Sequence, residues 1–118
     1  MRLSLQSENG GPARIKVAGA INQNGVRSIS RPFNGLLGEA PFSQRVVLDL
    51  SDSEYLDSSG VSWLLGTHEH FEESGGRLVL HSVSPMAMNV LKVLGMHRLF
   101  HVAGSERDAI QMVENDES

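Results

Sequence analysis

An acid, two hydroxyls and a glycine stand in a row at Asp57, Ser58, Ser59 and Gly60. They follow the β-branched run RVVLDL at 45–50, which predicts a buried strand, and they precede an apolar pattern that predicts a helix. We expect residues 51–57 to form a loop at the carboxyl edge of a sheet, where ligand and modification sites gather in α/β proteins. This junction is therefore the first place to look for chemistry.

Two roles are open for a serine at the start of this helix. A helix N-terminus leaves several backbone N–H groups without partners and carries about half a positive charge. A serine hydroxyl at that place can cap those N–H groups. Alternatively, the serine can accept a phosphoryl group, whose negative charge the same donors would stabilise. The local pattern permits either role for Ser58 or Ser59.

Catalysis by Ser58 is disfavoured. The stretch DSSG at 57–60 is not the Gly-x-Ser-x-Gly turn that exposes a serine nucleophile, and no histidine–acid pair is placed near it in the sequence. A chain of 118 residues also offers little room for a substrate cleft. We therefore predict that the protein is not an enzyme.

The five histidines do not predict a metal site. On a helix, His68 and His70 would point about 200° apart, so they cannot chelate one ion together. His81, His97 and His101 occur singly, and the absence of cysteine excludes thiolate ligands and disulfides. There is no glycine-rich phosphate loop either, so we expect neither a metal nor a cofactor.

Trp63 has two open interpretations. It would lie on the side of its helix away from the apolar stripe that contains Leu64 and Leu65. A neighbouring helix or strand would then cover it, or it would be an exposed anchor for a partner protein, a role in which tryptophan is enriched.

The remaining elements follow from hydrophobic periodicity and from serine, proline and glycine at helix ends. A hairpin is expected from strands at 3–8 and 13–18, and a broken or late-starting helix with Ser30 as N-cap falls within 19–44. The other expected strands are 45–50, 77–83 and 99–103, and the other expected helices are 59–73, 85–94 and 106–113. Because strands alternate with helices, we predict an α/β fold with a mixed sheet of about five strands and about four helices. The domain would cover 1–112, followed by an acidic C-terminal tail at 113–118.

The composition and net charge of the chain argue against some classes of binding partner. With 40% apolar and 20% charged residues the chain is typical of a soluble globular protein, and its net charge of −4 gives no broad attraction for nucleic acids. No secretory signal pattern is visible, and no apolar run approaches the roughly 18 residues that span a membrane. We expect a cytoplasmic protein that neither inserts into membranes nor binds nucleic acid.

Two segments, VVLDLSDSEYLDSSGVSWLLG and GGRLVLHSVSPMAMNVLKVLGMHRLF, resemble the STAS domain of bacterial anti-sigma factor antagonists. The resemblance covers roughly residues 45–110. It implies that Ser58, the first serine after the aspartate, is the phosphoryl acceptor, with Ser59 as runner-up. It also implies two partners: an anti-sigma factor of the histidine-kinase-like ATPase type that phosphorylates the domain, and a serine phosphatase that reverses the reaction. The implied partner-binding residues are Asp57, Ser58, Ser59, Gly60, Ser62, Trp63 and Asn22.

The chain departs from this family near residue 20. Members usually carry Gly-Glu-Leu/Ile-Asp after the second strand, whereas this chain has GAIN, with Ala20 and Asn22 in place of the acids. The resemblance therefore leaves an alternative open, in which the domain is a non-phosphorylated scaffold or a transporter-associated assembly module.

Overall fold

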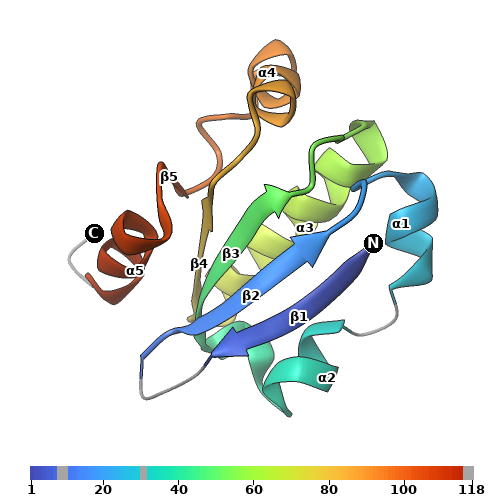
Figure 1. Ribbon diagram of the computed structural model, residues 1–118. Coiled ribbons are helices and arrows are strands. Elements are labelled where there is room, and N and C mark those ends of the chain that lie inside the picture. Colours follow the sequence, from blue (N-terminus) through green and yellow to red (C-terminus); the bar gives the residue numbers. More distant parts are fainter. Residues whose placement is uncertain (8–10, 30–31, 116–118) are drawn as a thin grey trace.

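A computed structural model describes residues 1–7, 11–29 and 32–115 (Figure 1). The described residues form one five-stranded sheet in the order β1-β2-β3-β4-β5. Strand β1 is antiparallel to β2, and the other neighbouring pairs are parallel, so the predicted mixed sheet is confirmed. The strands are β1 (Arg2–Ser7), β2 (Ala13–Ala18), β3 (Arg45–Asp52), β4 (Arg77–His81) and β5 (Val102–Ala103).

The predicted hairpin places apolar residues opposite one another. Leu3 pairs with Val17 and Leu5 with Ile15, so one face of β1 and β2 carries the side chains that the alternation predicts to be buried together. The turn residues 8–10 lie outside the described part of the chain.

Helices lie on both faces of the sheet and make three layers (Figure 1). Along the central strands alternate side chains face opposite helices: Leu48 belongs to the larger apolar cluster with α3, whereas Val47 belongs to a second cluster beneath α5. The helical elements are α1 (Gln23–Ser28), α2 (Pro32–Leu37), the short 3-10 helix η1 (Pro41–Ser43), α3 (Ser58–Glu73), α4 (Pro85–Val93) and α5 (Glu106–Glu114).

Signals at helix ends are confirmed where serine or glycine supplies them. The Oγ atoms of Ser84 and Ser105 accept hydrogen bonds from backbone N–H groups in the first turns of α4 and α5. Gly75 and Gly95 follow α3 and α4 with positive φ angles of 83° and 71°, a conformation that glycine adopts without steric cost.

The segment 19–44 holds the short helices α1 and α2 and the 3-10 helix η1, which agrees with the broken helix that the sequence predicts. Asn22 caps α1 by accepting a hydrogen bond from the N–H of Gly25 at 2.8 Å, and α2 begins at Pro32. The expected N-cap at Ser30 lies outside the described residues. Six-residue helices give too few periodic positions to be recognised in a stretch this rich in glycine and proline.

Strand ends differ from the expected ones for local reasons. Strand β3 runs to Asp52 because Ala18 of β2 still pairs with it there. Strand β4 stops at His81 because Ser82 adopts a left-handed φ of 58°. The last strand comprises only Val102 and Ala103, since the chain from Met96 to Leu99 forms a hydrogen-bonded turn.

The last helix continues to Glu114, two residues past the expected domain boundary at 112, and its own residue Val113 is fully buried. Residues 116–118 lie outside the described part. In the described residues, no helix combines the length and the apolar character needed to cross a membrane.

Candidate functional site

The cap of α3 is Asp57, and neither serine serves as its N-cap. The helix begins at Ser58, and Oδ1 of Asp57 accepts a hydrogen bond from the N–H of Gly60 at 2.8 Å. Its Oδ2 accepts another from the N–H of Gln23 at 3.3 Å. The capping interpretation of the serines is therefore wrong, and their hydroxyls are free for another role.

Backbone hydrogen bonds hold the loop before α3 against the segment after β2. The N–H of Ile21 donates to the carbonyl of Tyr55 at 2.9 Å, and the N–H of Asp57 donates to the carbonyl of Ile21 at 3.3 Å. At the start of the loop, the buried hydroxyl of Ser53 donates to the carbonyl of Val17 at 3.0 Å. The start of α3 is thus positioned by strand β2 and its extension.

Gly60 is required by this close packing. A Cβ atom at this position would overlap the carbonyl group of Ile21. Glycine at this position therefore permits the close approach of the two backbones at the start of α3.

The expected partner-binding residues differ in exposure. Ser58 and Ser62, one helical turn apart, are exposed. Asn22, Asp57, Ser59 and Trp63 are half-buried, and Gly60 is buried. Asn22 lies near the serines because the next residue, Gln23, bonds to Asp57. The structure therefore brings the segment at residue 22 to the start of α3, although 34 residues separate Gln23 from Asp57.

Trp63 falls between its two interpretations. Its ring stacks on that of Phe33 in α2, with centroids 6.4 Å apart and an interplanar angle of 15°. Helix α2 therefore covers part of it, and Trp63 is neither fully buried nor a freely projecting anchor.

The end of β3 and the loop that leads to α3 carry exposed polar side chains. Asp52 pairs with Lys16 at 3.2 Å, and the exposed Glu54 and Tyr55 follow on the loop. The hydroxyl of Ser84 donates to the carbonyl of Glu54 at 3.2 Å, which ties the start of α4 to this loop. A shallow hollow of about 430 Å³ opens beside it, lined by Gly19, Ala20, Ser51, Asp52, Glu54 and Tyr55.

The histidines of the described residues do not contact the two hydroxyls through hydrogen bonds. Among the described residues, the histidine side chains that form hydrogen bonds do so with Ser82 and Glu72, and none bonds to Ser58 or Ser59. Within the described part of the chain, the exposed Ser58 at the helix start is thus not bonded to a histidine of the kind that activates a serine nucleophile.

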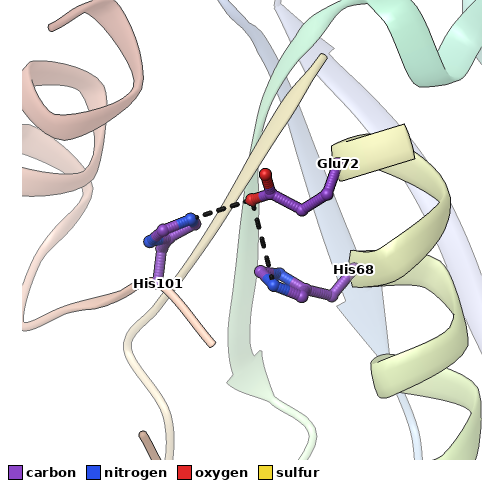
Figure 2. Close-up of side chains that lie close together, drawn as sticks. All are labelled: His68, Glu72 and His101. Carbon is purple, nitrogen blue, oxygen red and sulfur yellow. Dashed lines mark hydrogen bonds and ion pairs between the residues drawn. The ribbon is translucent and has the colours of Figure 1, made fainter. Parts of the chain in front are cut away.

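The histidines are less isolated than the sequence indicated. His70 points away from His68 as expected and stacks on Phe42 at 3.7 Å. His101, however, comes next to His68 and Glu72 (Figure 2). Burial lowers the pKa of His68, while the carboxylate of Glu72 opposes this effect. Sequence analysis missed this cluster; the four-residue spacing of His68 and Glu72 was the only local signal for it.

Comparison with known proteins identifies the family. The family model described as "Mlab, STAS domain" matches residues 4–104. The chain belongs to the STAS domain family. The matched residues include both halves of the domain, and with them the region around Ala20 where the chain departs from the usual family pattern.

Individual relatives of this STAS domain are distant. An anti-sigma F factor antagonist of Paenibacillus polymyxa is 25% identical over 71 residues, which make up 60% of this chain and 61% of the relative. The match thus spans less than two thirds of that relative's length.

Solved structures agree in fold. An anti-sigma factor antagonist from Mycobacterium paratuberculosis superposes with a TM-score of 0.77 at 19% identity, covering 97% of this chain and 96% of the other. SpoIIAA in its unphosphorylated form gives 0.68 at 22%, covering 95% and 96%. The phosphorylated form of Bacillus SpoIIAA gives 0.65 at 22%, covering 96% and 100%. At these identities the likeness establishes the fold.

Proposed function

We propose that this STAS domain is an anti-sigma factor antagonist, a binding regulator and not an enzyme, which is switched by phosphorylation of Ser58. The observation that carries the proposal is the position of Ser58. It is exposed at the first residue of the 16-residue helix α3, and Asp57 supplies the cap in its place. The name of the Paenibacillus relative and the phosphorylated form of SpoIIAA support the same assignment.

The helix start can accommodate a phosphoryl group without refolding. Asp57 already satisfies the N–H groups of Gly60 and Val61 through its side chain and its carbonyl. The N–H groups of Ser58 and Ser59 remain at the helix end, where the helix dipole favours an anion. A phosphoryl group on Ser58 would therefore have donors beside it.

The same group would change what the surface can bind. Phosphorylation adds about −1.5 to −2 charges. The added charge would lie next to the carboxylate of Asp57, at an end of the sheet where Asp52 and Glu54 are also exposed. A partner whose surface fits the neutral hydroxyl would have to desolvate the phosphate dianion or would be repelled by it. Either effect weakens binding.

Ser58 is favoured over Ser59 as the acceptor because of accessibility. Ser59 is half-buried, whereas Ser58 is exposed, and a kinase must reach the hydroxyl from solvent. The proposed kinase is the binding partner itself, an anti-sigma factor of the histidine-kinase-like ATPase type, and a serine phosphatase would reverse the reaction. These partners would act on the protein in the cytoplasm.

A second candidate, a STAS scaffold or transporter-associated module that is not phosphorylated, is favoured by the region around Asn22. Asn22 caps α1 through its side-chain oxygen, a role that asparagine and aspartate perform equally well. Asn22, where the resemblance implies an aspartate, therefore keeps the local fold. It provides no negative charge beside Ser58, the proposed phosphoryl acceptor.

Binding and mass measurements test the proposal together. We expect Ser58→Ala to bind a histidine-kinase-like anti-sigma factor as the wild type does, and Ser58→Asp to bind it at least about tenfold more weakly, a loss of about 1.4 kcal/mol. Ser43→Asp is the matched control, because the exposed Ser43 precedes β3 whereas Ser58 follows its far end. Equal binding by the Ser58 variants would remove the switch.

Incubation with that partner and ATP should add one phosphate to the wild-type chain and none to Ser58→Ala. A serine phosphatase should then restore the original mass. Tight binding with no added phosphate would support the scaffold instead.

A further inference from the structure

Three potential metal-ligating side chains meet at the edge of the sheet (Figure 2). His68 and Glu72 lie one turn apart on α3, and His101 lies in the segment just before β5. Oε1 of Glu72 is 3.0 Å from Nε2 of His101 and 3.9 Å from Nε2 of His68. One potential ligand atom from each residue lies within 4.8 Å of the other two.

We propose that His68, Glu72 and His101 bind a divalent transition metal ion, with Zn²⁺ as the preferred ion. Two imidazole nitrogens and one carboxylate oxygen form a ligand set that zinc accepts, with a fourth position left for water or another ligand. Zinc bonds of about 2.0–2.1 Å place neighbouring tetrahedral ligand atoms about 3.3 Å apart. The separations in the cluster span this value, so small side-chain adjustments suffice.

The ring of His68 is held in place before any ion binds. It is nearly buried and packs edge-on against Phe100, with centroids 5.6 Å apart and an interplanar angle of 70°. The ring of His101 lies 5.3 Å away on another side. A ligand whose orientation is fixed by packing loses little conformational entropy when it binds.

A cavity with acidic side chains in its lining borders the cluster. A cavity of about 380 Å³ is lined by Leu65, His68, Glu69, Glu72, Glu73 and Leu99. Three of these residues are glutamates, and none is lysine or arginine, so the lining favours a cation. The cavity also gives an ion a route from solvent to His68 and Glu72, two of the three ligands, and a binding site requires such a route.

This site is separate from the serine end of α3. His68 is ten residues beyond Ser58, or about 15 Å along the helix axis. An ion here would join α3 to the chain that enters β5, a strand of only two residues. Binding to the folded form alone would stabilise it by mass action.

Zinc titration of the untagged 118-residue chain after chelator treatment tests the proposal. Calorimetry should give one Zn²⁺ per chain, and one equivalent should raise Tm. Co²⁺ should give visible ligand-field absorption that Zn²⁺ abolishes. His101→Gln and Glu72→Gln, both at partly exposed positions, should each weaken zinc binding at least about tenfold and remove the rise in Tm.

His70→Gln is the matched control, since it removes a histidine of the same helix that lies outside the cluster. It should bind zinc as the wild type does. Circular dichroism checks that each variant is folded. If His101→Gln does not fold, Glu72→Gln alone provides the test of the cluster. The proposal is overturned if the wild type binds no zinc, or if all the variants bind it equally. It is also overturned if the cluster variants lower Tm by the same amount with and without zinc, since the cluster would then be a hydrogen-bonded network only.

Discussion

Oδ1 of Asp57 accepts a hydrogen bond from the backbone N–H of Gly60 at 2.8 Å, which makes the aspartate the cap of the helix that carries the two serines. Replacing it with alanine leaves that N–H without its partner. We expect Asp57→Ala to lower the free energy of unfolding by about 1 kcal/mol, measured by urea denaturation. Asp57→Asn keeps an oxygen that can accept from the N–H of Gly60, but its amide nitrogen cannot accept from the N–H of Gln23, so it should lose less stability than Asp57→Ala. A loss as large as that of alanine would show that the bond to Gly60 is not the main contribution of Asp57.

Two glycines of α3 should respond oppositely to alanine. At Gly60 a methyl group would overlap the carbonyl group of Ile21, so Gly60→Ala should lower the free energy of unfolding by about 1–3 kcal/mol. At Gly66 a methyl group would enter open space in the middle of the same helix. Gly66→Ala should therefore raise stability by about 0.5–1 kcal/mol. Thermal denaturation of both variants tests the pair, and changes of the same sign would contradict the close packing at Ile21.

Ser58 should contribute little to folding, because its side chain is exposed and the cap comes from Asp57. We expect Ser58→Ala to change the free energy of unfolding by no more than about 0.5 kcal/mol. Chemical denaturation measures this change. A loss above about 1 kcal/mol would mean that the serine itself caps the helix.

His81 should make stability depend on pH. It is buried at 2% exposure, and its Nδ1 lies 2.9 Å from Oγ of Ser82. Burial lowers the pKa of His81 below its ordinary value, although the carboxylates of Asp49 and Glu106 oppose the shift. The unfolded chain therefore binds the proton more readily, and stability is lost as pH falls below about 6.5.

Urea denaturation between about pH 5 and 7.5 checks this dependence. The free energy of unfolding should decrease toward the acid end, and the decrease should be smaller in His81→Gln. His68 also has a pKa lowered by burial, so part of the dependence should remain in this variant. The explanation fails if the variant and the wild type lose stability equally.

Most of the framework could be predicted from local sequence. Alternation of Leu3, Leu5, Ile15 and Val17 predicted the hairpin, because each side of a strand meets one environment. Ser84 with Pro85 marked the start of α4, because a cap and a preset φ act within one turn. The STAS resemblance rested on local motifs of the same kind, and the two segments that carry it lie within residues 4–104, which the family model matches.

The details of the serine end depended on geometry that short motifs do not encode. Asp57, Ser58 and Ser59 are all acceptable caps, and the backbone path decides among them. That path is set by Ile21, which bonds to Tyr55 and Asp57 from a segment more than thirty residues earlier. The exposure of Ser58 and the partial cover of Trp63 by Phe33 depend on the same packing.

The sequence by itself determined an α/β domain with Asp-Ser-Ser-Gly at the carboxyl end of a central strand, because periodicity and turn chemistry act over a few residues. Only the tertiary structure decided which residue caps α3, how short β5 is, and that His101 joins His68 and Glu72. The physical reason is distance along the chain: 29 residues separate Glu72 from His101, and only the packing of α3 against the sheet brings them together.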